Sequence, residues 1–400
     1  MKRMSGDPSH SLSCDETVRR VKGMKKNSIL FLMRGGICLS FSALFFSAAV
    51  LANGGLKERT PAAIEAYNVR GLDVSMAQAE PFAEGGAFAA AGMGELAQAA
   101  DEAEDRSVLA YCQVTTPNYG ARANLRFCEG EYFSADASAG LEAVMPESLA
   151  KELFPEGGEG GRIKINGREY TVRGVYEDGG VLTQLGSGKI PVIYCSGPAD
   201  PEAPAEHLLI GAEAGKTAQQ LKQETAVALR TPLEGETHDL ESMRQLGESL
   251  LLLGFFFAGL WFVLRLCVFS HRKLIFAYEC KGPGARRGLA AFWGFGAFLA
   301  AVLVFLALLQ LVRVPAVYLP ENNIFDFSYY GREILSGIQR MNTDGRVRDF
   351  SRICAVYLWA ETGCIILAVP LFWAGCRRLL DGAVLLKFLR DIQDLVPHKR

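Results

Sequence analysis

The sequence predicts a membrane protein with four transmembrane α-helices and an α+β extracytoplasmic domain inserted between helices 1 and 2. Half of the 400 residues are hydrophobic, yet the mean hydropathy is only +0.13, so very apolar segments must alternate with polar ones. Four segments approach the roughly 20 apolar residues that a helix needs to cross a bilayer. A long stretch of ordinary soluble composition separates the first of these segments from the second.

The composition also excludes several functions. The formal net charge is −2 and the basic residues form no stripe, which argues against a nucleic-acid partner. Of the ten cysteines, only Cys112, Cys128 and Cys195 fall in the long polar stretch, so at most one disulfide can form within it. No CxxC spacing occurs in the chain, and we expect neither a metal nor a cofactor.

The four spans are predicted at 29–52, 248–270, 289–312 and 353–374. The first contains the shortest uninterrupted apolar run, Ile37–Ala52, and it reaches the required length only if the helix begins before Arg34 and this residue extends its charged end to the interface. A cleaved signal peptide is the alternative for this segment, because a basic leader precedes an apolar run that ends in small residues near Ala52.

Orientation follows from the lysines and arginines close to the spans. They are concentrated in the leader 1–28, in the loop 271–288 and in the tail 375–400, which we place on the cytoplasmic side. The polar stretch 53–247 and the loop 313–352 are then extracytoplasmic, and both termini are cytoplasmic. We expect a multi-pass protein of the cell membrane.

The inserted stretch 53–247 has the turn signals of a folded domain. Gly161–Tyr176 contains two alternating runs around Asn166-Gly167, which predicts a β-hairpin with a type I′ turn. Pro146–Phe154 is predicted to form a short helix, and the alanine-rich stretch Val74–Arg106 a partly helical segment.

A phosphate-binding loop is suggested by Gly211–Thr217, GAEAGKT, which lies between an apolar run and a helical pattern. Its spacing is one residue shorter than GxxxxGK[ST], and it falls on the side of the membrane that lacks ATP. We therefore predict a strand, a turn and a helix capped by Thr217.

In combination, three stretches of the insert resemble the periplasmic core domain of MacB-type and FtsX-type ABC transporter permeases. The stretches are Gly130–Phe133, Ala143–Phe154 and Gly161–Tyr176, followed by three spans. The resemblance implies a subunit without catalytic activity that works as a homodimer or heterodimer with a cytoplasmic ATPase on a separate chain. It also implies contact with membrane lipid, and an extracytoplasmic accessory protein is a further partner of such systems.

In that family the loop between the second and third helices carries a coupling helix that docks on the ATPase. The corresponding stretch begins at His271, and its candidate contact residues are Leu274, Ile275, Phe276, Tyr278 and Gly282. Leu274 departs from the pattern, because such permeases carry a glutamate there. A short interfacial helix that only tethers two spans is the alternative.

Two further features bear on mechanism. Glu361 is an ionisable residue within the fourth span, placed either in the interior of the bundle or close to the outer headgroups. The tail has apolar residues at a spacing that gives one helical face, predicting an amphipathic helix along the membrane or the ATPase, or a solvated one.

The predicted function is a permease subunit that transmits an ATP-driven conformational change to the extracytoplasmic domain, in export, lipoprotein or lipid handling, or mechanotransmission. The first alternative is a receptor or adaptor that works without ATP. The second is a membrane-anchored hydrolase, which has little support because His207 is the single histidine of the insert near an apolar run and no GxSxG or HExxH motif occurs.

Overall fold

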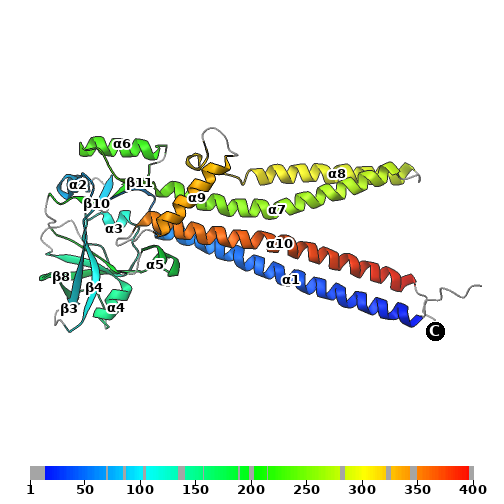
Figure 1. Ribbon diagram of the computed structural model, residues 1–400, viewed down its shortest axis with the longest axis horizontal. Coiled ribbons are helices and arrows are strands. Elements are labelled where there is room, and N and C mark those ends of the chain that lie inside the picture. Colours follow the sequence, from blue (N-terminus) through cyan, green and yellow to red (C-terminus); the bar gives the residue numbers. More distant parts are fainter. Residues whose placement is uncertain are drawn as a thin grey trace, which may run out of the picture. The chain divides into compact units, whose positions relative to one another are not determined.

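The computed structural model describes residues 14–68, 71–83, 87–101, 105–133, 140–155, 157–187, 190–197, 202–213, 215–279, 284–320, 326–342 and 349–395. Contacts divide the chain into two compact units (Figure 1). The helical unit comprises Met1–Ala49, Leu252–Val312 and Thr362–Arg400, and the sheet unit comprises Val50–Leu251 and Arg313–Glu361.

Four long helices supply the helical unit: α1 (Cys14–Arg59), α7 (Leu240–Glu279), α8 (Gly284–Leu309) and α10 (Phe350–Leu395). Within the described residues, these are the helices whose length and apolar composition would allow them to cross a membrane. Three of them, α1, α7 and α10, are uninterrupted and contribute residues to both units. The two units are therefore joined by continuous helices and not by loops alone.

Within the helical unit, α1 lies antiparallel to α10 through small residues (Figure 1). A Cβ atom added at Gly35 would lie 2.9 Å from the Leu379 side chain. The Ser28 hydroxyl donates to the carbonyl of Gly382, and the Ser42 hydroxyl to that of Ala368. The pair α7 and α8 makes a similar contact, in which Ser270 donates to the carbonyl of Gly294 at 2.7 Å. Small residues let two backbones approach closely in apolar surroundings.

The sheet unit contains two sheets. The four-stranded sheet is antiparallel, in the order β11 (Glu236–Asp239), β1 (Ala63–Tyr67), β10 (Ala205–Gly211) and β2 (Phe88–Gly92). The strands β1, β2 and β10 are buried almost throughout, as their alanine-rich and leucine-rich sequences require.

The second sheet is larger and mixed. Its order is β5 (Phe127–Gly130), β8 (Arg168–Tyr176), β6 (Glu142–Pro146), β9 (Val192–Cys195), β4 (Ser107–Val114), β3 (Glu95–Asp101) and β7 (Arg162–Ile165). Because β7 also pairs with β8, the strands from β8 to β7 close on themselves around an apolar core. Core residues of this ring include Met145, Ile163 and Ile193, all without exposed surface.

Shorter helices complete the sheet unit. They are α2 (Met76–Ala83), α3 (Tyr119–Arg122), α4 (Glu147–Leu153), α5 (Val181–Ser187), α6 (Ala218–Leu229), the 3-10 helix η2 (Ala316–Tyr318) and α9 (Phe327–Asn342). The sequence did not lead us to expect α9.

Several local predictions are confirmed. β7 and β8 form the predicted hairpin, with positive φ at Asn166 and Gly167 as a type I′ turn requires. The predicted helix after Pro146 is α4. Gly211–Thr217 lies between β10 and α6, and Thr217 forms a capping box with Gln220, so this stretch has the predicted strand, turn and helix. The alanine-rich stretch is helical only at α2, because its later residues pair as β2 and β3.

Helix ends differ from the predicted span limits. α1 continues unbroken through Ala52 to Arg59, and Leu56 is fully buried. α7 continues through Glu279, so the predicted coupling helix is the end of α7 and not a separate element. α10 continues to Leu395, so the described part of the predicted tail extends the fourth helix.

Candidate functional site

The sheet unit contains a junction where the ends of three long helices pack on the two sheets. We define this junction as Val50–Arg59 of α1, Leu240–Leu251 of α7 and Phe350–Glu361 of α10 with the strand residues that they contact. Its apolar core joins helix residues to strand residues; the helix residues are Ala52, Leu56, Leu240, Met243, Phe350, Ile353, Cys354, Tyr357 and Leu358. The first turns of the predicted fourth span therefore lie in a protein core.

A buried carboxylate of β1 holds the first turn of α10. Glu65 lies in an otherwise apolar strand and has no exposed surface. Its Oε1 accepts a hydrogen bond from the amide of Phe350 at 3.1 Å, and its Oε2 accepts one from the amide of Ser351 at 2.9 Å. The first amides of a helix lack intrahelical acceptors and carry partial positive charge, so a carboxylate there is favourable.

His207 completes this buried cluster. Its Nε2 lies 2.7 Å from Oε1 of Glu65, and its Nδ1 lies 3.0 Å from the hydroxyl of Tyr119. Burial is the largest single influence and lowers the pKa of His207, but the charge and hydrogen bond of Glu65, together with the charges of Asp349 and Glu206, raise it, and the net shift is upward. The ring also stacks on Phe350, with centroids 6.1 Å apart. The histidine thus links β10, β1 and the start of α10.

His207 is poorly placed for catalysis. Its ring has no exposed surface, and both nitrogens face Glu65 and Tyr119 within the junction. A general base must reach a substrate proton directly or through one water molecule. This histidine therefore gives the hydrolase alternative no support.

A second polar contact of the junction involves Glu361. Asn53 of α1 donates from Nδ2 to both carboxylate oxygens, at 3.5 and 3.4 Å, and Glu361 has no exposed surface. Gly247 of α7 lies against both groups, since a Cβ atom there would be 2.9 Å from Asn53 Nδ2. The structure therefore places Glu361 inside a contact of three helices.

The helix α5 also packs on the first turns of α10. The hydroxyls of Thr183 and Tyr357 lie 2.8 Å apart. A Cβ atom at Gly186 would lie 2.7 Å from the Cα of Ile353, so only glycine allows this approach. The ring of Tyr357 in turn covers Gly55 of α1. These contacts connect the ring-shaped sheet to the same helix ends.

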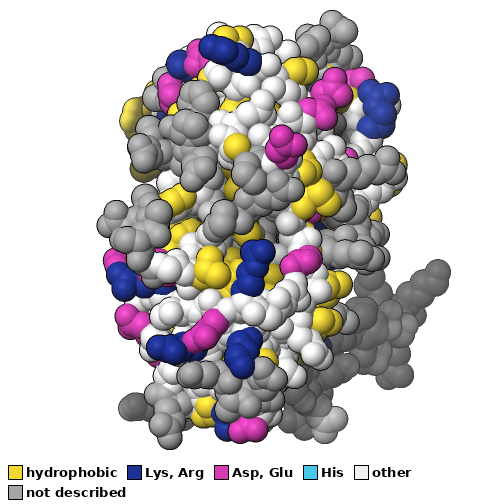
Figure 2. Space-filling view, turned by 90° about the vertical axis from the view of Figure 1, so that its left-hand side faces the viewer, with side chains coloured by type: hydrophobic (Ala, Val, Ile, Leu, Met, Phe, Trp, Pro, Cys, Tyr) yellow, Lys and Arg dark blue, Asp and Glu magenta, His cyan; other side chains and the backbone are white. Residues whose placement is uncertain are grey.

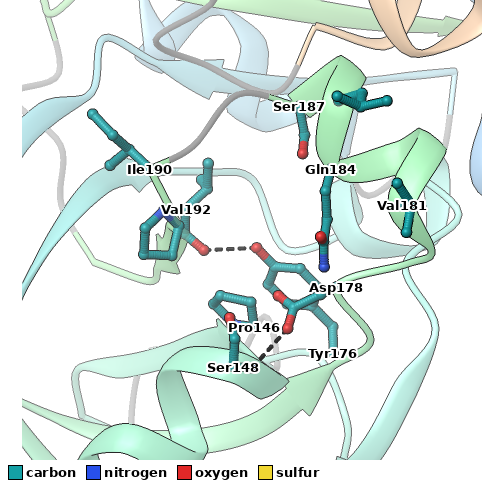
Figure 3. A pocket seen from close by; sticks show the side chains of 11 residues that line it. Pro146, Ser148, Tyr176, Asp178, Val181, Gln184, Ser187, Ile190 and Val192 are labelled. Atoms are coloured by element: carbon teal, nitrogen blue, oxygen red, sulfur yellow. Dashed lines mark hydrogen bonds between the residues drawn. The ribbon is translucent and has the colours of Figure 1, made fainter. Parts of the chain in front are cut away.

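A cavity of about 420 Å³ lies on the side of α5 that carries Val181 and Gln184 (Figure 3). The Asp178 carboxylate accepts a hydrogen bond from the amide of Ser148 at 2.7 Å, and the Tyr176 hydroxyl donates to the carbonyl of Val192 at 2.7 Å. The lining mixes these polar groups with apolar side chains such as Val181 and Ile190. Its position places α5 between the cavity and α10.

The predicted coupling residues fall in the helical unit, apart from the junction. Ile275, Phe276 and Tyr278 are exposed near the end of α7. Leu274 is as exposed as Ile275 and also packs against Gly294 of α8. Gly282 lies outside the described residues. The exposed apolar side chains at this end of α7 are therefore Leu274, Ile275, Phe276 and Tyr278.

The cysteines and the charged side chains of the sheet unit form no recognisable site among the described residues. Cys112, Cys128 and Cys195 are free thiols, and only Cys128 is exposed. No cluster of metal-ligating side chains occurs among the residues that the structure describes. On the face seen in Figure 2, the described Lys and Arg side chains alternate with Asp and Glu, without a patch of one sign.

Comparison with known proteins identifies the inserted domain. Residues 42–226, just under half of the chain, match the family described as MacB-like periplasmic core domain. The insert is similar to the MacB-like periplasmic core domain over these residues. This match confirms the resemblance to MacB-type permeases, and with the four apolar helices it indicates a multi-pass membrane protein with an extracytoplasmic domain.

Two solved structures are similar to the MacB-like domain. One is the periplasmic region of MacB from Actinobacillus actinomycetemcomitans, with 12% identity and a TM-score of 0.35, covering 46% of this chain and 91% of that one. The other is the extracellular domain of the noncanonic ABC-type transporter YknZ from Gram-positive bacteria, with 11% identity, a TM-score of 0.32, and 44% and 98% of the two chains covered. No curated protein matches the chain significantly in sequence.

Our sequence reasoning missed most of the junction. Glu65 offered one signal, because a charged residue inside the apolar run of β1 is expected to have a buried partner. The identity of that partner, the start of α10 some 285 residues later, follows only from the fold.

Proposed function

We propose that this chain is the permease subunit of an ABC transporter, which transmits an ATP-driven conformational change from a separate cytoplasmic ATPase to the extracytoplasmic domain. The main observation behind the proposal is that Glu65 accepts hydrogen bonds from the first amides of α10. A buried carboxylate of the MacB-like domain accepts hydrogen bonds from the first turn of a helix that continues as a candidate span. A displacement of that helix would act directly on β1.

The other long helices support the same function. α1 and α7 are also continuous between the junction and the helical unit, and Asn53, Glu361 and Gly247 bring all three helices together. Motion of the helix bundle would thus reach the domain at several points. In this proposal the subunit is not catalytic, both termini are cytoplasmic, and a second permease copy completes the transporter.

The ATPase would dock on the end of α7, where Ile275, Phe276 and Tyr278 are exposed and basic residues flank them. Leu274 would also contact the ATPase while it packs against Gly294 of α8, at the position where related permeases carry a glutamate. Gly282 would end the docking segment.

Co-purification tests this proposal. The protein is extracted from its native membrane in mild detergent, and we expect an ATPase subunit to accompany it. Ile275→Glu and Phe276→Asp should each release that subunit, because a charge in an apolar contact loses the buried area and leaves the charge unpaired. Val227→Asp is the matched control, since Val227 is 78% exposed on α6 of the sheet unit.

Two results would contradict the proposal. If no ATPase accompanies the wild-type chain, an ATP-independent receptor or adaptor is the better description. If the ATPase remains bound to both α7 variants, the docking site lies elsewhere.

Orientation is tested separately with a membrane-impermeant maleimide. Cys128 is the exposed cysteine of the MacB-like domain, while Cys112 and Cys195 are buried. We expect labelling of intact cells that Cys128→Ser abolishes. Labelling that appears only after the cells are opened would place this domain in the cytoplasm.

A further inference from the structure

The helix α9 has two chemically different faces. At 100° per residue, Tyr330, Ile334, Leu335 and Ile338 fall on one side of the helix, while Arg332 and Ser336 fall on the other. Ile334 is 51% exposed, Leu335 60% and Ile338 37%, so these apolar side chains are not covered by the rest of the described chain. Adjacent exposed aliphatic side chains on one face indicate an interaction surface.

The start of α9 is well defined. Asp326 accepts hydrogen bonds from the amides of Ser328 at 3.0 Å and Tyr329 at 3.2 Å, which satisfies two of the first amides of the helix. The Tyr329 hydroxyl donates to the carbonyl of Val317 in η2 at 3.2 Å. The amphipathic segment is therefore a capped helix tied to the preceding turn.

Chain connectivity allows α9 to lie close to the bilayer. In the sequence, α9 lies between α8 and α10, both of them candidate spans. The link 343–349 can reach about 25 Å. The part of α10 that precedes the helical unit, Phe350–Glu361, rises only about 18 Å at 1.5 Å per residue. The link can thus span the whole length of this part of α10.

The composition of α9 suits a lipid surface. Long aliphatic side chains with a tyrosine on the apolar face are typical of helices at a membrane interface. The helix sequence contains Arg332, Glu333 and Arg340, an excess of one positive charge, which favours anionic headgroups. A polar face that carries charge and hydroxyl groups would remain in the headgroup layer.

We propose that α9 lies in the outer interface of the bilayer, with Tyr330, Ile334, Leu335 and Ile338 inserted among the acyl chains and Arg332 in the headgroup layer. Such a helix anchors the chain at the membrane immediately before α10 begins, and so restrains the base of the junction from outside. The inference goes beyond the proposed function and does not depend on an ATPase partner.

Photo-crosslinking of the full chain in native membranes tests the inference. The photoreactive amino acid p-benzoylphenylalanine replaces Ile334 or Ile338 on the apolar face, or Arg332 on the opposite face as the control. After irradiation, mass spectrometry of the α9 peptide should detect phospholipid adducts joined through the acyl chains at Ile334 and Ile338, and these acyl-chain adducts should be lost at Arg332. The two apolar positions provide independent variants if one of them prevents folding.

Three results would overturn the inference. A crosslink between two copies of this chain would show that the apolar face is a subunit contact. A crosslink to another protein, or no crosslink at either apolar position, would show that α9 is not in lipid. Acyl-chain adducts of equal yield at all three positions would show that the membrane does not distinguish the two faces of α9.

Discussion

The sheet unit and the helical unit hold the same helix, α10, by different chemistry. In the sheet unit, its first turns are bonded by the buried polar groups of Glu65, Thr183 and Asn53. In the helical unit, α10 packs on α1 through glycines, where Gly35 receives Leu379 and Gly375 receives Leu39. The end in the sheet unit is held mainly by buried polar side chains, whereas the other end is held mainly by close backbone packing, to which the hydrogen bonds of Ser28 and Ser42 contribute.

This difference bears on how a motion could travel along the helix. Hydrogen bonds weaken steeply when their angle or length changes, so the junction resists a shift of α10 relative to β1. Contacts between packed helices permit small sliding movements. A displacement of α10 should therefore be accommodated against α1 in the helical unit and passed on to the sheets at the junction.

The largest expected effect is that of Glu65→Ala. The change leaves two amides of α10 without acceptors and His207 without its buried partner, which costs about 3–5 kcal/mol for a buried pair. We expect a large loss of thermal stability of the full chain in nanodiscs. Hydrogen–deuterium exchange should increase at Phe350 and Ser351.

Glu65→Gln is the matched control, because its side-chain carbonyl can still accept a hydrogen bond from one of the two amides. It should have an intermediate stability. If the amides of Phe350 and Ser351 exchange as slowly in Glu65→Ala as in the wild type, Glu65 does not stabilise the first turn of α10.

An intermediate effect is expected for Gly35→Val in the helical unit. A Cβ atom at Gly35 would lie 3.0 Å from the backbone nitrogen of Leu379, so α1 and α10 must separate, at a cost of about 1–3 kcal/mol. Gly36→Val is the control, because nothing lies within 4 Å of a Cβ atom there. Titration with SDS should unfold the Gly35 variant at a lower detergent fraction than the Gly36 variant. Equal midpoints would mean that close packing does not hold this helix pair.

Features that depend on neighbouring residues could be predicted from the sequence, whereas features that depend on contacts between distant residues could not. Hydropathy and turn chemistry act locally, so the apolar helices and the hairpin around Asn166-Gly167 were predictable. The junction depends on contacts between residues far apart in the chain, such as Glu65 with Ser351. The regular pattern of α9 was readable in principle, but we assigned its region to a loop because it lies between two spans.

The smallest effect concerns a buried carboxylate that lies outside the contact with α10. Glu206 precedes His207 on β10, and its Oε2 accepts hydrogen bonds from the Tyr111 hydroxyl at 2.8 Å and from the amide of Gly94 at 3.4 Å. Burial raises the pKa of Glu206 above its usual 4.5, and these two hydrogen bonds offset the increase only in part. The folded protein therefore keeps this proton at pH values where the unfolded chain has lost it.

It follows that the wild-type chain loses stability as the pH rises from 4.5 through the raised pKa of Glu206. Glu206→Gln is neutral and can still accept these hydrogen bonds, so it should lack this part of the pH dependence and be slightly more stable at neutral pH. Thermal unfolding of both proteins across this pH range measures the difference. Exchange at Phe350 should remain as in the wild type, since Glu206 does not bond to α10. Parallel profiles of thermal stability against pH would show that Glu206 ionises normally. Faster exchange of the Phe350 amide in Glu206→Gln would show that Glu206 also stabilises the start of α10.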